Sequence, residues 1–334
     1  MELRAEGMKA EILHPAHGFE PAITQLEVRW DPLTGHAARV LPPSGLMTPV
    51  RCDLGPLADE TRPQCPFCSE RIESAVPRFP PAILPEGRIR VGEAVLFPNL
   101  APLAKYSSVS VYSPERHFLR LSELTPRLVA DNLAAQVAFD RAVLAADAGA
   151  SWASVNANHL LPSGSSIFHP HFQGAVHPTP TNQQRLLAAV PGERYADYLA
   201  TERRLGRRWL GEIGGIQWLT AFAPLAAGEI RAFLPGGPSS PAELASDEVE
   251  ALGTGISLAL GLYAELGFET FNMALYGAPP GTPGYVLNLR LVCRPNPVPF
   301  YRSDVAWLDR LHNEAAVDLA PEDLADRAGG RFRQ

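Results

Sequence analysis

The densest group of potentially reactive side chains lies in the stretch His169-Pro170-His171-Phe172-Gln173. Residues two apart on a β-strand point to the same face, so a strand over residues 167–176 would align His169, His171 and Gln173 in one polar row. Buried polar groups need hydrogen-bond partners, and a core-facing strand would not carry two imidazoles and an amide without them. The row indicates either a reactive site or the solvent-facing side of an edge strand.

The segment directly before this row favours a reactive site. Pro162-Ser163-Gly164-Ser165-Ser166 supplies small residues, hydroxyls and free backbone amides. Such a loop can wrap a phosphate because its backbone approaches the ligand closely and its N–H groups donate hydrogen bonds. Ser/Gly turns are common, so the loop carries little weight alone. Its position directly before two histidines predicts a phosphate held beside a nucleophile.

A second feature with chemical potential is the CPFC motif at Cys65 and Cys68. Two thiolates at this spacing, with histidines elsewhere in the chain, suit tetrahedral zinc. The alternative is a redox pair, which normally sits at a strand-to-helix junction, whereas this motif follows a proline-rich loop. Metal is therefore favoured, with His117 as a candidate ligand. His159 and His177 flank the site and fit either a structural or a functional role. We interpret the others as surface or structural residues: His14, His17, His36 and His312.

The composition is that of an ordinary globular protein and argues against nucleic acid and membranes as partners. Of 334 residues, 46% are hydrophobic and 19% are charged, and the net charge is −7 without a basic run. No stretch approaches the roughly 20 apolar residues needed to span a bilayer. The first residues carry charges where a secretory signal needs an apolar core, and only four cysteines are present, so we expect a cytoplasmic protein without a disulfide framework.

The elements that must position these residues recur along the chain. A helix signal over 122–147 is followed by strands at 152–158 and 167–176, and a helix at about 241–266 is followed by strands at 268–276 and 285–293. Helix, strand, Gly/Pro loop and strand thus occur twice, offset by roughly 119 residues, which favours an internal duplication over a chance order. Further strands are expected at 24–30, 93–99, 106–113, 216–224 and 228–235, a polar helical region at 181–205, and a helix from Pro321.

With these motifs in place, the chain resembles the galactose-1-phosphate uridylyltransferase family, a branch of the histidine-triad superfamily. The resemblance implies an α+β fold: a duplicated histidine-triad unit whose two α/β halves share an open, mostly antiparallel sheet. We expect the halves at residues 1–180 and 181–334. The matching motifs are DPLTG (31–35), CPFC (65–68), FPN (97–99), YSPERH (112–117), Asn158 with GSSIFHPHFQ (164–173), and DLAPEDLADR (318–327).

The resemblance also implies roles for individual residues. His171 is implied as the nucleophile, with Gln173 beside it, and a homodimer is implied whose partner chain helps to cover the active site. The implied ligands of one structural zinc per chain are Cys65, Cys68, His117 and His169. The residues implied to hold the nucleotide phosphates are Asn99, Asn158, Ser166 and Gln173, with Gly164 and Ser165 in the phosphate loop.

This assignment is chemically consistent. A neutral imidazole can attack the α-phosphorus of a nucleoside diphosphate compound, and the phosphate monoester that leaves needs little help from an acid. The nucleotidyl-histidine then passes its nucleotide to a second phosphate, which gives ping-pong kinetics. The other ring nitrogen must be held, most simply by a backbone carbonyl. Glutamine at position 173 can donate a hydrogen bond but cannot deliver a proton, which favours transfer over hydrolysis.

Other positions depart from the family pattern. Family members carry arginines near the nucleotide, but the corresponding stretch of this chain, PPSGLMTP (42–49), contains none. The family's second metal site uses histidines, and this chain has Tyr276, Asn288 and Arg290 in that region instead. We therefore expect no second metal. The family residues that grip the hexose have no counterparts here, where Arg310 and Ala316 fall nearby, so the sugar is not assigned.

The favoured function is transfer of a nucleoside monophosphate between a nucleotide sugar and a sugar phosphate. The alternatives are a phosphorylase that uses inorganic phosphate, a hydrolase of nucleotide conjugates, and a non-catalytic zinc-stabilised nucleotide sensor. A sensor needs no nucleophile, so the HPHFQ context argues against it.

Overall fold

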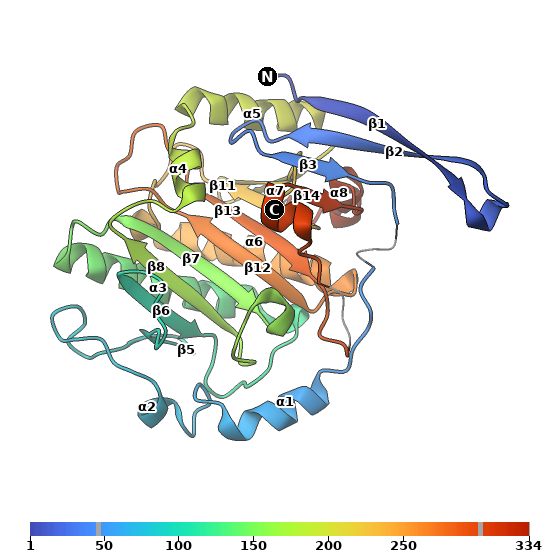
Figure 1. Ribbon diagram of the computed structural model, residues 1–334. Coiled ribbons are helices and arrows are strands. Elements are labelled where there is room, and N and C mark those ends of the chain that lie inside the picture. The colour runs from blue at the N-terminus through green and yellow to red at the C-terminus, as the bar shows by residue number, and fades with distance from the viewer. Residues whose placement is uncertain (45–47, 300–302, 334) are drawn as a thin grey trace.

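The computed structural model describes residues 1–44, 48–299 and 303–333, and among these the central element is a ten-stranded sheet whose neighbouring strands all pair antiparallel (Figure 1). Its first five strands in the chain are β4 (Ile89–Val91), β5 (Ala94–Pro98), β6 (Tyr106–Val111), β7 (Trp152–His159) and β8 (His171–His177). The other five are β9 (Trp209–Ile213), β10 (Ile216–Thr220), β11 (Ile230–Phe233), β12 (Thr270–Tyr276) and β13 (Asn288–Arg294).

The sheet is built from two halves with the same plan. Each half contributes three strands, one long helix and two further strands, and these helices are α3 (Pro126–Ala146) and α6 (Ser246–Glu265). The spatial order is β4-β5-β6-β8-β7-β12-β13-β11-β10-β9, so the second half mirrors the first. The halves meet where β7 pairs with β12, with Asn156 opposite Ala274. The fold is therefore the duplicated α+β architecture that the sequence predicted.

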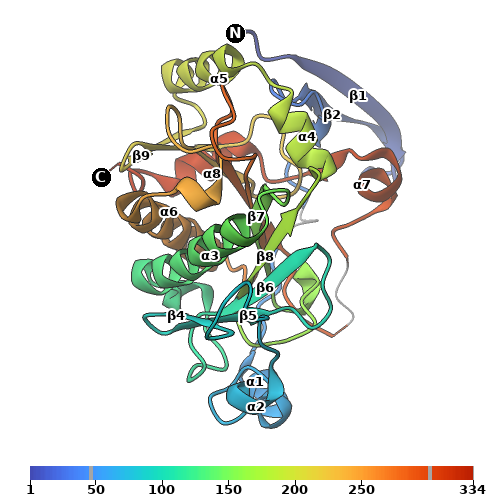
Figure 2. The same cartoon turned by 90° about the vertical axis from the view of Figure 1, so that its left-hand side faces the viewer.

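Both long helices cover the same face of this sheet, as Figure 2 shows. They pack closely against each other, since a Cβ atom on Gly253 of α6 would lie 2.9 Å from the backbone nitrogen of Ala130 in α3. Alternate residues of the strands, such as Val155 and Phe172, join the apolar core beneath these helices. The intervening residues, including His171 and Gln173, therefore point to the opposite face of the sheet.

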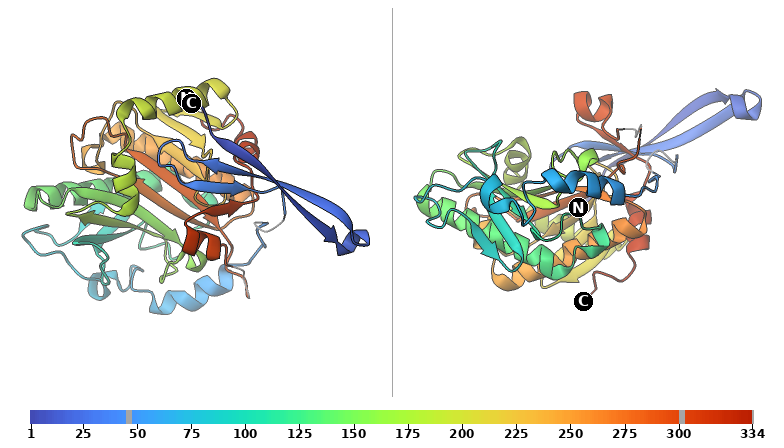
Figure 3. Two further views of the ribbon diagram at one scale, coloured as in Figure 1. Left: turned by 45° about the horizontal axis from the view of Figure 1, so that its top comes forward. Right: turned by 90° about the horizontal axis from the view of Figure 1, so that it is seen from below.

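A smaller sheet lies against the second half. Its strands are β1 (Ala5–His14), β2 (Glu20–Trp30), β3 (Ala37–Val40) and β14 (Ala315–Val317), and β14 runs parallel to β3. Figures 1 and 3 show the outer parts of β1 and β2 projecting from the body as a two-stranded ribbon. The remaining helices are α1 (Gly55–Thr61), α2 (Ile72–Ala75), α4 (Asn182–Ala188), α5 (Gly192–Leu205), α7 (Trp307–His312) and α8 (Pro321–Ala328).

The expected elements are present, with three informative differences. The helix expected after Ser122 begins at Pro126, because Thr125 accepts the hydrogen bond of Leu128 N–H as its cap and proline suits the first helical turn. The strand expected from residue 167 begins at His171. Strand β1 lies where no element was expected, since almost all of its side chains are exposed and its sequence therefore lacks alternation.

The expected boundary near residue 180 falls between β8 and α4, and we propose it as the division between the halves. The small sheet spans this division, because β3 of the first range pairs with β14 of the second. Of the PPSGLMTP stretch, residues 45–47 lie outside the described residues. Within the described part of the chain, none of the helices combines the length and apolar character that crossing a membrane requires.

Candidate active site and metal centre

His171 is the first residue of β8, and its imidazole is buried, with 5% of the residue exposed. Its Nδ1 atom lies 2.8 Å from the backbone carbonyl oxygen of His169. A carbonyl oxygen only accepts hydrogen bonds, so Nδ1 must carry the proton and Nε2 keeps its lone pair. Burial lowers the pKa of His171, although the bond to the His169 carbonyl opposes this shift, and the neutral ring is favoured. A ring held in this tautomer can attack an electrophile through Nε2.

The walls around this imidazole come from neighbouring strands and from the CPFC loop. The ring of Phe67 meets the His171 ring edge-on, with 5.4 Å between centroids. Strand β6 places Val111 opposite His171 on the same face. These apolar contacts fix the plane of the imidazole, and they exclude water from one side of it.

Gln173 lies two residues further along β8 and points to the same face as His171. Its main chain pairs with Asn156 of β7, whose Nδ2 atom lies 3.3 Å from the Gln173 carbonyl oxygen. The Gln173 side chain is partly exposed, so its amide can reach a ligand at this face. The structure thus brings the two residues expected to be catalytic side by side on one strand.

The Ser/Gly loop joins the end of β7 to the HPHFQ segment. Gly164 has a φ of 95° and is exposed, and its left-handed conformation turns the backbone of the loop. Ser165 donates its hydroxyl to the Ile167 carbonyl oxygen at 2.6 Å, so that hydroxyl holds the loop itself together. Ser166 is exposed. Asn158, at the end of β7, accepts a hydrogen bond from Asn272 of β12 at 2.6 Å.

Asn99 lies further from this group. Its backbone nitrogen bonds Ser107 of β6 at 3.0 Å, and Ser107 pairs with Ala175 of β8, so Asn99 is two strands away and level with a residue beyond Gln173. Its Oδ1 atom accepts the Ala101 N–H at 3.0 Å and caps a tight turn. The structure thus leaves Asn99, which the family resemblance placed among the phosphate-binding residues, at the margin of the group around His171.

The four expected metal ligands come together in one buried cluster. One potential ligand atom from each of Cys65, Cys68, His117 and His169 lies within 4.8 Å of the others. His169 was expected to lie on the strand with His171, but it does not belong to β8. It precedes the strand, and its ring turns toward the two cysteines, whereas His171 and Gln173 lie on the strand and share one face.

The geometry of this cluster fits a tetrahedral metal ion. The Nδ1 atom of His169 lies 3.6 Å from each cysteine Sγ, and Nδ1 of His117 lies 3.2 Å from Sγ of Cys68. Ligand atoms around a tetrahedral zinc are about 3.3–3.8 Å apart. The Nε2 atom of His169 lies 2.9 Å from the Ser113 carbonyl oxygen, and that of His117 lies 2.9 Å from the Thr61 hydroxyl. Metal-bound imidazoles usually make such a hydrogen bond through their second nitrogen.

Electrostatics also favours a cation at this position. Burial, and then the neighbouring Cys65, raise the pKa of the Cys68 thiol to about 12, so a buried cation is needed to stabilise a thiolate there. Burial lowers the pKa of His169 to about 3 and also lowers that of His117, so both rings are neutral and able to act as ligands. The cluster could therefore hold a metal ion with four protein ligands.

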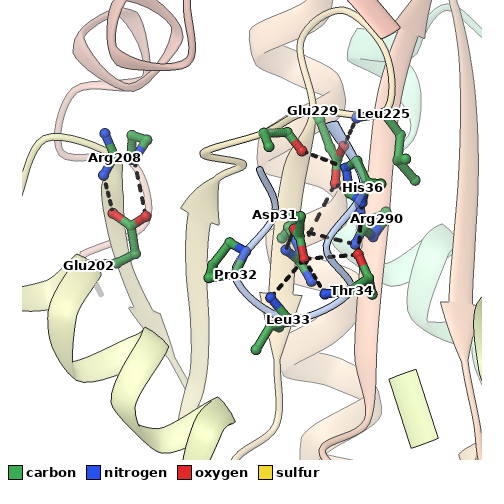
Figure 4. A network of polar contacts seen from close by, with 12 residues as sticks. Asp31, Pro32, Leu33, Thr34, His36, Glu202, Arg208, Leu225, Glu229 and Arg290 are labelled. Atoms are coloured by element: carbon green, nitrogen blue, oxygen red, sulfur yellow. Dashed lines mark hydrogen bonds and ion pairs between the residues drawn. The ribbon is translucent and has the colours of Figure 1, made fainter. Parts of the chain in front are cut away.

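The corresponding face of the second half carries buried ion pairs, shown in Figure 4. Arg290 of β13 contacts Glu229 at 2.9 Å, and Arg231 of β11 contacts Asp31 at 2.8 Å. All four residues are at most 3% exposed. Burial alone would raise the pKa of Asp31, but the two guanidinium charges hold it well below its usual value. Arg290 is thus committed to carboxylates, and the DPLTG turn that carries Asp31 is anchored on the second half.

The remaining residues singled out from the sequence lie outside the group around His171 and outside the metal cluster. His159 is buried, and its ring stacks on Phe271 with 5.2 Å between centroids, which indicates a packing role. His36 belongs to the ion-pair region, where its Nε2 atom lies 2.8 Å from the Ala223 carbonyl oxygen. Ala316 sits in β14, and Arg310 is an exposed residue of α7. Sequence analysis missed Asn272, although the alternation in FETFNMALY places it on the polar face of its strand.

Comparison with known proteins gives one full-length relative and several similar structures. No family model matches the chain. An uncharacterised protein of Archaeoglobus fulgidus is 31% identical over 340 residues, which covers 97% of each chain. The crystal structure of an ADP-glucose phosphorylase from Arabidopsis thaliana with bound ADP-glucose superimposes with a TM-score of 0.66 at 18% identity, covering 91% of this chain and 98% of that one. A uridylyltransferase structure matches with a TM-score of 0.61 at 20% identity, with the same coverage. At these identities the two structures establish the fold.

Proposed function

Because this chain belongs to one family with the uncharacterised Archaeoglobus fulgidus protein and has the fold of the uridylyltransferase-like branch of the histidine-triad superfamily, we propose that it is a nucleotidyltransferase. In this proposal, it moves a nucleoside monophosphate from a nucleotide sugar to a sugar phosphate through a covalent intermediate on His171. The observation that carries the proposal is the hydrogen bond from Nδ1 of His171 to the His169 carbonyl oxygen, because it leaves the lone pair of Nε2 available as a nucleophile. The Ser/Gly loop that precedes His171 along the chain is of a kind that can bind phosphate.

The bond changes can be written out for this geometry. The lone pair of Nε2 forms an N–P bond to the α-phosphorus, and the P–O bond to the leaving sugar phosphate breaks with its electrons on oxygen. The His171 ring then carries a positive charge, because both nitrogens are substituted and Nδ1 keeps its proton. The His169 carbonyl dipole stabilises that charge. An oxygen of the second phosphate then forms a P–O bond to the same phosphorus, and the N–P bond breaks with its electrons returning to Nε2, which restores the neutral ring.

Gln173 and the amides around it are proposed to stabilise the negative charge on the phosphoryl oxygens. A carboxamide donates hydrogen bonds but cannot act as a general acid or base near neutral pH, so it does not activate water. We include Asn158, Ser166 and the backbone of Gly164 and Ser165 in this phosphate site. Asn99 is proposed to contact the nucleotide at the margin.

For the metal cluster we propose zinc, one per chain, held by Cys65, Cys68, His117 and His169. Four protein ligands leave no open coordination position, so the ion would stabilise the fold by joining the CPFC loop to the segment before β8. The compartment that we propose is the cytoplasm, where free cysteines persist. All four cysteines of this chain are unpaired.

A phosphorylase is the second candidate, and a hydrolase that uses the same histidine is a third possibility. The similarity to an ADP-glucose phosphorylase favours the second, since inorganic phosphate would then replace the sugar phosphate as the acceptor.

One experiment tests the function and separates these candidates. The protein is incubated with a panel of nucleoside diphosphate sugars that differ in base and in sugar, and its intact mass is measured. We expect a mass increase of one nucleoside monophosphate with at least one compound, and peptide mapping should locate it on His171. Removal of the adduct by a sugar phosphate indicates a transferase, by inorganic phosphate a phosphorylase, and by water alone a hydrolase. No adduct with any compound would contradict the proposal.

We also propose a homodimer, and the projecting ribbon supports it. Isolated two-stranded hairpins are marginal in water, yet this one exposes several apolar side chains. They are Met8, Ile12, Leu13, Phe19 and Ile23. Light scattering should therefore give twice the chain mass. Ile12→Asp should shift the protein to the monomer, whereas Gln25→Glu, an exposed polar position on the same ribbon, should not. A monomeric parent protein at micromolar concentration would contradict the dimer.

A further inference from the structure

We infer that Asn272, which comes from the second half, is a positioning residue that fixes the orientation of the Asn158 amide, so that Asn158 presents N–H groups and not its carbonyl oxygen to the phosphate. The inference rests on the proposed nucleotidyl transfer at His171. The second half would thus contribute to the reaction through the Asn272 side chain, which does not contact the reacting atoms.

The first step in the argument is the place of Asn158. Strand β7 pairs with β8, with Ala157 opposite Phe172, and continuing this register by one residue sets Asn158 opposite His171. Both side chains lie on the face away from the long helices. Because neighbouring strands are about 4.8 Å apart, a phosphate at the His171 Nε2 atom is within reach of the Asn158 amide.

The second step is the direction of the hydrogen bonds. Asp304 holds Arg294 by two contacts, of 2.6 Å to Nε and 2.7 Å to Nη2. The Nη1 atom of Arg294 donates to Oδ1 of Asn272. A guanidinium can only donate and a carboxylate can only accept, so this end of the network has one possible polarity.

The direction of the bond from Arg294 also determines the orientation of the Asn158 amide. With its oxygen bound to Arg294, the Asn272 side chain must turn its NH2 group the other way. That group donates to Oδ1 of Asn158 at 2.6 Å and to the Ser163 carbonyl oxygen at 2.9 Å. Asn158 therefore uses its oxygen within the protein, and among the described residues its own NH2 group keeps no hydrogen-bond partner. An amide that could rotate would present a carbonyl dipole to an anion in half of its orientations, which is unfavourable.

The variant Asn272→Asp tests this inference, because aspartate keeps the shape and can still accept from Arg294 but cannot donate to Asn158. We expect the Asn158 amide to turn around and the rate of adduct formation to fall at least about tenfold, toward the hundredfold or more that loss of one transition-state donor costs. Thermal stability and bound metal should match those of Asn182→Asp, a charge-matched control at an exposed position of α4.

A double-mutant cycle separates positioning from a general effect on the loop. Asn158→Ala should lower the rate of adduct formation about a hundredfold, and adding Asn272→Asp to it should change the rate less than about threefold. Should Asn272→Asp lower the rate by the same factor in both backgrounds, it acts through Ser163 and the loop, and the inference is overturned. An unchanged rate in the single variant overturns it as well.

Two further provisions keep the test decisive. If Asn272→Asp does not fold, the same cycle is run with Asn272→Ala, for which we expect a loss of about fivefold that disappears without Asn158. A parental protein that forms no adduct with any nucleotide contradicts the proposed function itself. Adduct formation by the parent, with no coupling between positions 158 and 272, contradicts the positioning role alone.

Discussion

Replacing His171 by alanine is expected to abolish formation of the nucleotide adduct, with a loss of more than about 10⁴-fold in turnover. The variant removes the Nε2 lone pair that attacks phosphorus, and the neighbouring imidazole of His169 cannot take its place. His169 has its Nδ1 atom between two cysteines and its Nε2 atom bound to a backbone carbonyl. The measurement is intact mass after incubation with the nucleotide sugar found most reactive in the parent protein.

His177→Ala is the matched control, because His177 lies on the same strand and on the same face, six residues from His171. We expect it to form the adduct at close to the parental rate. Both variants should stay folded with bound metal, since the His171 ring takes no part in the metal cluster. Turnover by His171→Ala at the parental rate would exclude the covalent mechanism and leave the HPHFQ row as a binding surface.

Two further variants probe the same step. His171→Gly should be partly rescued by a preformed nucleoside phosphoimidazolide, because this compound supplies the missing ring together with the activated nucleotide. Gln173→His should still form the adduct but lose it faster to water, since an imidazole can take a proton from water and an amide cannot.

Loss of the metal cluster is expected to have the largest effect on stability. Cys68→Ser should lower the free energy of unfolding by at least about 4 kcal/mol, because loss of a structural metal is among the few mechanisms that exceed the usual range of point mutations. Elemental analysis should find one zinc per chain in the parent and much less in the variant. The fraction of the variant that stays folded should still form the adduct, since no ligand of the cluster attacks phosphorus.

Cys52→Ser is the control for this variant, because Cys52 is a free, half-buried cysteine that does not belong to the cluster. Its unfolding transition should lie close to that of the parent. Purified parent protein without zinc, or equal unfolding transitions for Cys68→Ser and Cys52→Ser, would contradict a structural metal at this position.

Much of the fold follows from local patterns. The alternation in the strands around Val155 and Phe271 marks the core face of the large sheet, because these side chains are buried under the long helices. The repeated helix, strand, loop and strand predicted the duplication. Strand β1 was not predicted, because it is exposed on both faces and its sequence therefore lacks the alternation of polar and apolar residues that marks a half-buried strand. The start of β8 was placed too early, since the expected row extended to His169, which the metal cluster draws away from the strand.

Taken by itself, the sequence determined which reactive groups exist and how they are spaced. The CPFC motif, the Ser/Gly loop and HPHFQ each consist of neighbouring residues whose relative positions follow from local backbone geometry. The CPFC motif predicted a metal site with His117 as a candidate ligand, the family resemblance added His169, and strand periodicity placed His171 and Gln173 on one face. The structure brings both groups together.

Only the tertiary structure decided how these groups are oriented. That Nδ1 of His171 carries the proton depends on where the His169 carbonyl points. The pairing of Arg231 with Asp31 joins residues 200 positions apart, and the bond between Asn272 and Asn158 joins residues 114 positions apart. Periodicity reports which face a residue occupies, but not which residue of another strand stands beside it. Register, hydrogen-bond polarity and burial arise only when distant segments pack together, so these properties belong to the fold.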